Sequence, residues 1–319
     1  MRIIEGLEAL ESLDLRGQYD DSVEARSVVA VGVFDGVHLG HLRLLHELRE
    51  MASLLGGVPT VITFRRHPDE LLKGEAPPSI ISVPHRLRLL RRSGIERLVL
   101  LNFDDRLREM TARDFAELVL IGGLNTKGLL LGFDSAMGKD REGTVERFSE
   151  LGIELGFEVR GGEPFLVEGK PVSSTMIRNA IQVGDLDRGQ RLLGRWPSAF
   201  GEVVPGEGRG KSIGFPTANV ETQDFALPPQ GVYAVEVLHD GEQYPGVANL
   251  GVRPTFAGSN EPTPVLEVHL LDQDLQMYGA MIEVSFLAHI RDERRFPSGE
   301  ALREQIQDDI LKAREVFAS

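Results

Sequence analysis

Short apolar segments alternate with amphipathic segments along the first part of the chain. The apolar segments are rich in β-branched residues, which predicts strands, and the segments between them carry apolar residues at helical spacing. The predicted strands are 27–34, 59–64, 97–103 and 128–133, and the predicted helices are His41–Leu55, Pro84–Arg92, Thr111–Leu120 and Val145–Leu155. This alternation predicts right-handed βαβ crossovers and an α/β domain whose parallel sheet binds ligands at the carboxyl ends of its strands.

The pattern changes after two short helical segments, Thr175–Gln182 and Asp185–Leu193. Gly and Pro residues then separate strand-like segments at hairpin spacing, which is typical of a small antiparallel β-barrel. These segments are 199–204, 231–238, 244–252, 264–271 and 281–290. A C-terminal helix is predicted over Ser298–Phe317, because Leu302, Ile306 and Ile310 recur at four-residue spacing. We place the boundary in the helical connector, which gives domains of residues 1–187 and 188–319.

Composition and charge restrict the partners of the chain. Its 319 residues carry a formal net charge of -14, with a sequence pI near 5.1. Nucleic acids and anionic membranes attract basic surfaces, so we expect neither as a partner. The chain has no cysteine, which excludes disulfides and thiolate metal sites, and it shows no signal-peptide pattern or membrane-length apolar run. We expect a cytoplasmic protein that binds small molecules, as a monomer or a weak homo-oligomer.

A phosphate site is predicted at Gly32–His41, where the first buried strand is followed by a helix. A helix start directs unpaired backbone amides and a positive dipole end toward the crevice, which favours phosphate. Gly36 and Gly40 allow the backbone to come close, and His38 and His41 are three residues apart. Both imidazoles can therefore donate hydrogen bonds to the oxygens of a phosphoryl group that gains negative charge during transfer.

The run GVFDGVHLGH in this segment resembles the GxFDGxHxGH signature of the HxGH nucleotidyltransferases, most closely their flavin adenylyltransferase branch. Ser173–Arg178 (SSTMIR) resembles the family's SSTxIR segment, and Thr63–Pro68 (TFRRHP) resembles its TFxPHP segment. The resemblance implies a Rossmann-like fold in which His38, His41 and Arg178 are the catalytic residues that contact the ATP phosphates. It implies nucleotide or flavin contacts at Gly32, Phe34, Asp35, Gly36, Gly40, Phe64, His67, Asp134, Ser174 and Thr175.

Each motif has an alternative interpretation when taken singly. An isolated HxxH at a helix start is more often a surface pair, and an isolated SST is more often a helix cap. Zinc binding by the two histidines is disfavoured because the other histidines are scattered. The family's GxDFxFGxxRxG frame persists in Gly132–Gly143 through its glycines, Asp134 and Arg141, but Ser135 and Met137 replace its aromatic residues. This segment is either part of a ligand site or a variable surface loop.

The glycine-rich segment 206–212 has the composition of a Walker A loop but not its frame. Pro205 stands where the first glycine would be, and Gly214-Phe215-Pro216 follows in place of a helix. We therefore predict a glycine-rich flap between two barrel strands, with backbone amides that cradle phosphate.

The segment Gly214–Asn219 (GFPTAN) resembles the signature of riboflavin kinases, and the segments 228–237, 244–256, 266–272 and 291–296 resemble further parts of that family in order. The resemblance implies magnesium at Thr217 and Asn219, and Glu267 as the general base for a ribityl hydroxyl. It implies nucleotide or flavin contacts at Gly208, Gly210, Gly214, Pro216, Asn219, Arg291 and Arg295. Taken singly, Glu267 is more often a solvated strand residue, and each arginine is equally a surface charge.

Together, the two signature sets resemble the bacterial bifunctional riboflavin kinases and FAD synthetases. The resemblance implies an enzyme that phosphorylates riboflavin to FMN and adenylylates FMN to FAD, with ATP as co-substrate and Mg²⁺ as cofactor. Two alternatives stay open. One is a riboflavin kinase whose altered Gly132–Gly143 segment leaves the adenylyltransferase domain weak or inactive, and the other is a non-catalytic flavin-binding protein.

Overall fold

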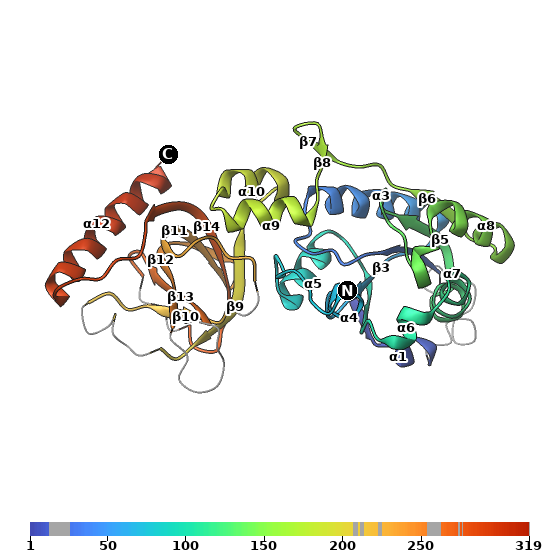
Figure 1. Cartoon of the computed structure of the whole chain (residues 1–319), viewed down its shortest axis with the longest axis horizontal. Coiled ribbons are helices and arrows are strands. Elements are labelled where there is room, and N and C mark those ends of the chain that lie inside the picture. Colours follow the sequence, from blue (N-terminus) through green and yellow to red (C-terminus); the bar gives the residue numbers. More distant parts are fainter. Residues whose placement is uncertain are drawn as a thin grey trace. The chain divides into compact units, whose positions relative to one another are not determined.

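The computed structural model describes residues 1–12, 26–206, 210, 214–222, 225–253, 263–273, 275 and 277–318. These residues form two compact units (Figure 1). The first unit comprises Met1–Pro77 and Arg86–Ser173, and the second comprises Pro78–His85 and Ser174–Ser319.

A six-stranded sheet in the order β1-β4-β3-β2-β5-β6 forms the centre of the first unit. All of its neighbouring strands are parallel. The strands are β1 (Arg2–Glu5), β2 (Ser27–Val31), β3 (Val58–Phe64), β4 (Arg97–Leu101), β5 (Thr126–Leu131) and β6 (Glu158–Gly161). β2 and β4 are buried along their whole length, as expected for parallel strands that are covered on both faces.

Helices pack on both faces of this sheet. On one face, α3 (Leu39–Leu55) lies so close to β5 that a Cβ on Gly128 would be 2.6 Å from Cε of Met51. On the other face, η2 (Phe115–Gly123) and α8 (Val145–Leu155) share a core cluster with Val29 and Val31 of β2. The remaining elements are α1 (Leu7–Glu11), α4 (Asp69–Lys73), α5 (Val83–Arg92), α6 (Asp105–Glu109), α7 (Ala112–Asp114), η3 (Lys139–Arg141), β7 (Leu166–Val167) and β8 (Lys170–Pro171).

The strand order reverses between β2 and β5. From β2 the chain adds β3 and β4 on one side, whereas β5 and β6 lie on the other side. Open α/β sheets bind their ligands at such a switch point, outside the carboxyl ends of the strands. The predicted phosphate segment Gly32–His41 begins directly after the last residue of β2, Val31, so the topology places it at this position.

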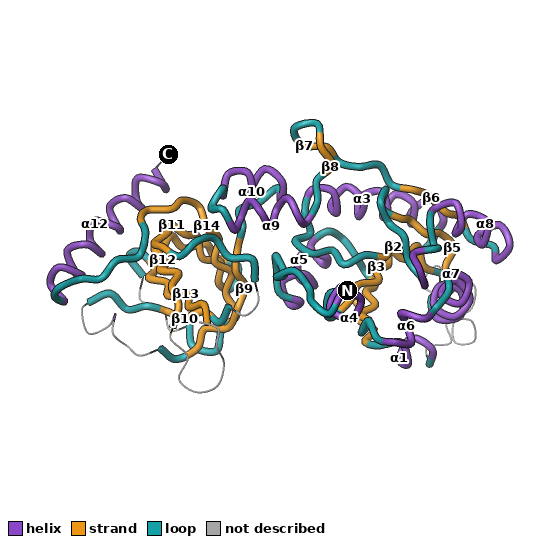
Figure 2. The backbone as a smooth tube through the Cα atoms, viewed as in Figure 1, coloured by secondary structure: helices purple, strands orange, loops and turns teal. Residues whose placement is uncertain are grey.

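The second unit is a closed antiparallel barrel in the order β10-β13-β12-β11-β14-β9 (Figure 2). Its strands are β9 (Ser198–Val204), β10 (Ala218–Val220), β11 (Gly231–His239), β12 (Glu242–Arg253), β13 (Thr263–Leu270) and β14 (Met281–Arg291). The helices α9 (Ser174–Gln182) and α10 (Leu186–Leu193) precede the barrel. The helix α12 (Gly299–Ala318) runs along its outside, where Ala313 packs against Val232 and Val247 (Figure 1). No helix among the described residues is long and apolar enough to cross a membrane.

Both predicted fold classes are confirmed, with differences in individual elements. The predicted strand 27–34 ends at Val31, because the N–H of Gly32 makes the last bond to β3 before the chain turns. The predicted helix Thr111–Leu120 begins as α7 but continues as the π-helix η2. Sequence analysis did not predict β1, β6, β10 or the β7–β8 hairpin. The boundary near Asp187 falls within α10 and stays a prediction.

A buried polar cluster holds the segment Pro78–His85 within the second unit. His85 is fully buried, and its Nε2 lies 3.1 Å from Oε1 of Glu283 on β14. Ser198 on β9 donates a hydrogen bond to the same oxygen at 3.1 Å. Burial lowers the pKa of Arg195 to about 10, and the negative charge of Glu283 opposes this shift. Glu283 therefore compensates a buried cation.

Glu283→Ala should destabilise the second unit by roughly 3–5 kcal/mol, because Arg195 would stay buried without this carboxylate. Trp196, the one tryptophan of the chain, packs against the barrel core, so its fluorescence in a urea titration reports the unfolding of this unit. Glu202→Ala on the exposed side of β9 is the control, with an expected change within about 0.5 kcal/mol. Equal, small effects of both substitutions would contradict this role of Glu283.

Candidate active sites

The turn between β2 and α3 forms the first candidate site. It passes through three left-handed residues, with φ of 53° at Phe34, 81° at Gly36 and 39° at Val37. Glycine adopts such angles without strain, but a bulky or β-branched residue does so at a cost on the order of 1–3 kcal/mol. The turn must therefore be held in place by contacts from its surroundings.

The two predicted histidines meet at the start of α3. His38 is the N-cap, and its Nδ1 accepts a hydrogen bond from the backbone N–H of His41 at 3.2 Å. Because Nδ1 is the acceptor, the neutral ring of His38 carries its proton on Nε2. The two rings stack with their centroids 3.6 Å apart and their planes at 16°, and the ring of Phe34 lies 5.1 Å from that of His41. Both imidazoles are thus within reach of one anion at the helix start.

Two glycines of this turn lie in close contact with neighbouring rings. A Cβ on Gly40 would lie 3.1 Å from Nδ1 and Cε1 of His38, and a Cβ on Gly32 would lie 3.2 Å from the ring of Phe34. Contacts this short push the neighbouring ring aside. The glycines therefore leave room for the observed positions of the rings of His38 and Phe34.

The other predicted residues of the first unit follow the ends of neighbouring strands. Asp35 is 5% exposed, whereas Asp134, which follows β5, is exposed. The ring of Phe64 meets Phe103 edge-on at 5.8 Å, so it packs into the core beside the crevice. Nδ1 of His67 accepts a hydrogen bond at 3.1 Å from the backbone N–H two residues further along the chain. The predicted set thus contains both core and solvent-facing side chains.

The predicted residues of the SSTMIR segment lie mostly in the second unit. Ser174 and Thr175 begin α9, and Arg178 is 7% exposed on the same helix. Nε of Arg178 donates a hydrogen bond to the carbonyl of Pro78 at 2.7 Å. The contact of these residues with ATP phosphates stays a prediction.

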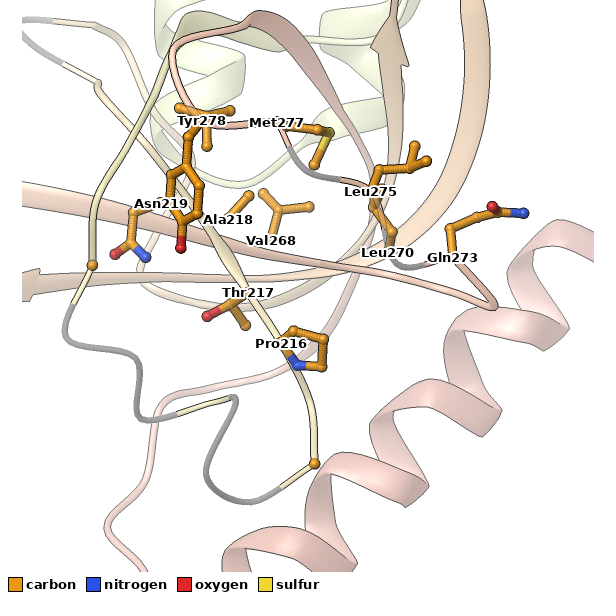
Figure 3. A pocket seen from close by; sticks show the side chains of 13 residues that line it. Pro216, Thr217, Ala218, Asn219, Val268, Leu270, Gln273, Leu275, Met277 and Tyr278 are labelled. Atoms are coloured by element: carbon orange, nitrogen blue, oxygen red, sulfur yellow. The ribbon is translucent and has the colours of Figure 1, made fainter.

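A cavity of about 360 Å³ at the start of β10 forms the second candidate site. Thr217 and Asn219 line it together with Pro216 and Gly214, and Figure 3 shows apolar side chains around the same space. The apolar and aromatic residues of the lining are Val203, Ala218, Val268, Leu270, Leu275, Met277 and Tyr278. The side-chain oxygens of Thr217 and Asn219 lie beside apolar and aromatic groups, which fits a ligand with a charged end and a flat, apolar end.

The antiparallel register brings the predicted kinase residues together. Asn219 on β10 lies directly opposite Glu267 on β13, and Glu267 lies directly opposite Asn249 on β12. Directly opposed residues project from the same face, with Cβ atoms about 4.5–5.5 Å apart. The predicted base is therefore a close neighbour of Asn219, which lines the cavity with Thr217.

The described part of the glycine flap lies directly over these oxygen donors. A Cβ on Gly206 would overlap the side chain of Asn219, and a Cβ on Gly210 would lie 3.1 Å from Oγ1 of Thr217. Gly214 has a φ of 92°, in the left-handed region. Gly208 lies outside the described residues. The flap backbone is therefore close enough to share a ligand with Thr217 and Asn219.

Comparisons with known proteins agree with both sites. A family model of FAD synthetase matches residues 20–176, and one of riboflavin kinase matches residues 193–317. A bifunctional riboflavin kinase/FMN adenylyltransferase from Pseudomonas fluorescens is 38% identical, covering 95% of this chain and 97% of the relative. A relative of the same name from Bacillus subtilis is 35% identical, with coverages of 93% and 94%. The chain belongs to the bifunctional riboflavin kinase/FMN adenylyltransferase family.

A solved structure extends this result to the fold. A crystal structure described as a macrolide-efflux protein from Streptococcus pneumoniae matches with a TM-score of 0.82 and 31% identity. The match covers 98% of this chain and 99% of that chain. Membership of the family confirms the prediction of an enzyme that combines an FAD synthetase domain with a riboflavin kinase domain.

The arginines predicted near the flavin have different surroundings. Arg291 at the end of β14 is paired with Asp309 of α12, with Nη2 2.8 Å and Nε 3.0 Å from its carboxylate oxygens. Asp309 is 1% exposed, so this pair fixes the helix to the barrel. Arg295 is exposed. The flavin contacts of both arginines stay predictions.

Sequence analysis missed His269, which supports the GFPTAN segment. Nδ1 of His269 lies 2.8 Å from the carbonyl oxygen of Pro216, and the ring meets that of Phe215 edge-on at 5.6 Å. His269 lies two residues after Glu267 on a predicted strand, and residues at this spacing share a face of the sheet. This spacing was the available signal that His269 lies on the same face as the predicted base.

Sequence analysis also missed Arg86 on α5. Its guanidinium is buried and donates to the carbonyls of Val33 and Phe64 at the first site. No sequence signal indicated this, since an arginine among leucines on a helix is ordinarily a solvated charge.

Gly40→Ala should lower FMN adenylyltransferase activity about tenfold, because the added methyl group displaces the ring of His38. FAD formation from FMN and ATP, followed by chromatography, measures this effect. Gly299→Ala is the control, since a Cβ there meets no atom within 4 Å. Riboflavin phosphorylation by Gly40→Ala should be unchanged. Undiminished FAD formation would show that the ring position does not matter.

Proposed function

We propose that the two domains, residues 1–187 and 188–319, catalyse consecutive ATP-dependent steps of flavin cofactor formation. The barrel transfers the γ-phosphoryl group of ATP to a ribityl hydroxyl of riboflavin, giving FMN and ADP. The sheet domain then lets the FMN phosphate attack the α-phosphorus of a second ATP, giving FAD and pyrophosphate. The observation that supports this best is the presence of two separate phosphate-type sites, the histidine-lined start of α3 and the glycine-covered pair Thr217 and Asn219.

Glu267 is the general base of the kinase reaction. Its position opposite Asn219 in the register supports this role, because the base must lie beside the phosphate that the hydroxyl attacks. The hydroxyl oxygen forms a bond to the γ-phosphorus, the bond to the β-phosphate oxygen breaks, and the hydroxyl proton passes to Glu267. The flap amides and Thr217 hold the phosphates during this step.

Mg²⁺ fits the oxygen donors of the kinase site. Thr217 and Asn219 offer neutral oxygen ligands, which hard cations prefer. Among the described residues, no group of three or more His, Cys, Asp or Glu side chains could hold a metal by itself. Phosphate oxygens of ATP would therefore complete the coordination, as is usual for Mg²⁺ at nucleotide sites. Bound there, the ion neutralises charge on the phosphate oxygens.

Positioning and hydrogen bonding carry the adenylyl transfer. His38 donates from Nε2, since its Nδ1 is held by the backbone of His41, and His41 stacks beside it. Both rings and the amides at the start of α3 stabilise the negative charge that develops around the α-phosphorus. Arg178 supplies a further contact to the phosphates. No covalent intermediate with the protein is needed.

The setting of the reactions follows from the substrates and the charge of the chain. The partners are riboflavin, FMN and ATP, bound by a monomer or weak homo-oligomer in the cytoplasm. The net charge of -14 disfavours nucleic acids and anionic membranes as partners. A time course of riboflavin, FMN and FAD with the wild-type chain tests the scheme, in which FMN must rise before FAD.

His41→Ala should lower FMN adenylylation by about 10²–10³-fold, because a donor to the developing charge is lost. Glu267→Gln should instead lower riboflavin phosphorylation by about 10²–10⁴-fold, because the amide cannot accept the proton. Each variant is the folding control for the other, as each should keep the opposite activity. Loss of both activities in a folded variant would refute the assignment of two sites.

Thr217→Val should raise the Mg²⁺ concentration required for half-maximal kinase activity about tenfold, because one oxygen ligand is lost without a change of shape. Titration of Mg²⁺ at saturating ATP measures this shift. The Mg²⁺ dependence of FAD formation by the same variant is the control and should not change. Equal shifts in both reactions would mean that Thr217 does not act at the kinase metal.

A further inference from the structure

Arg86 is a buried cation whose contacts converge on the adenylyltransferase site. The residue is 6% exposed and belongs to the first unit. Its Nη1 donates a hydrogen bond to the carbonyl of Val33 at 2.8 Å, and its Nη2 donates to the carbonyl of Phe64. One planar guanidinium therefore links the backbone at the end of β3 to the backbone of the turn that follows β2.

These two carbonyls lie where regular strand pairing ends. The β2–β3 ladder closes with Val31 opposite Ile62 and the bond from the N–H of Gly32 to the carbonyl of Ile62. Beyond that point the carbonyl of Val33 accepts hydrogen bonds from two side chains, Arg86 and Thr63, the latter at 3.0 Å. Side chains thus satisfy the backbone of the turn where the sheet no longer does.

The carbonyl of Val33 precedes a residue whose ring packs against His41. Val33 precedes Phe34, which has a φ of 53° and whose ring lies 5.1 Å from that of His41. A strained residue persists only when its surroundings determine its conformation. Fixing the carbonyl of Val33 fixes the peptide that precedes Phe34, and so the surface on which His41 packs.

We propose that Arg86 is a positioning residue for adenylyl transfer, which holds the turn after β2 in the geometry that presents His38 and His41 to the phosphates. This inference rests on the proposed function. The fork of Arg86 is suited to two carbonyls at once, whereas a lysine offers a single ammonium group.

The electrostatics of the site are consistent with a permanent charge on Arg86. Burial lowers the pKa of Arg86 to about 10, and the negative charge of Asp35 opposes this shift. Asp35 is itself 5% exposed, so the turn carries a buried carboxylate of its own beside the cation. Arg86 therefore stays protonated near neutral pH.

Arg86→Met should lower kcat of FAD formation about 100-fold with little change in KM for FMN, because misplaced catalytic groups affect the transition state most. Arg86→Lys keeps the charge but only part of the fork, so it should recover part of the lost kcat. Arg92→Met, an exposed arginine on the same helix, is the matched control and should behave as the wild type. Riboflavin phosphorylation by each variant reports whether the barrel is folded, and the far-UV circular dichroism spectrum reports whether the first unit is folded as well.

The imidazole NMR signals of His38 and His41 give a readout that does not depend on activity. They should shift in Arg86→Lys and stay unchanged in Arg92→Met. A kcat of Arg86→Met within twofold of the wild type, or unshifted imidazole signals in Arg86→Lys, would overturn the inference. If Arg86→Met does not fold, the Arg86→Lys variant is used in its place. A kcat within twofold of the wild type or unshifted imidazole signals in that variant would then overturn the inference. Absence of FAD formation by the wild type would instead contradict the proposed function, and the NMR comparison would still test Arg86.

Discussion

The adenylyltransferase site depends on how the chain leaves the sheet after β2. A strand that ends at a topological switch point must turn into a helix without leaving buried backbone groups unpaired. Here side chains satisfy the turn, since Thr63 and Arg86 donate to the carbonyl of Val33 and His38 accepts from the amide of His41. The hydrogen bonds that stabilise the turn also position the two histidines. A change that breaks these bonds therefore alters both the stability of the turn and the geometry of the site.

The kinase site depends on strand register. Because successive residues of a strand project to opposite faces, Asn219 and Glu267 are neighbours only while β10 pairs with β13 in the observed register. A slip by one residue would turn Glu267 to the opposite face. The closed barrel prevents such a slip, since β10 is also paired with β9 and β13 with β12. A site made of residues far apart in sequence is thus as rigid as the sheet itself.

Sequence patterns predicted the elements that are regular over many residues. The predicted helix Val145–Leu155 has the bounds of α8, because an N-cap threonine and a left-handed glycine mark its ends. The three-residue strand β10 was missed because it is too short to show a period. Motifs indicated His38, His41, Thr217 and Asn219, whose roles stay predictions, whereas Arg86 and His269 were not predicted. Both act on backbone carbonyls of other segments. Arg86 left no local pattern, and the signal for His269 was its two-residue spacing from Glu267.

The different side chains of the two sites follow from the protonation states of their nucleophiles. A ribityl hydroxyl holds its proton at neutral pH, so its attack requires a base, and the proposed base, Glu267, lies opposite Asn219 in the barrel. The phosphate of FMN is already largely ionised, with a second pKa of about 6, so the adenylyl transfer needs no base. It needs donors for anionic oxygens, and the sheet domain supplies imidazoles, helix-start amides and a turn held by a buried arginine. Such local donors also explain how a chain with a net charge of -14 binds triphosphates, because charges beyond about 8 Å are largely screened at physiological salt.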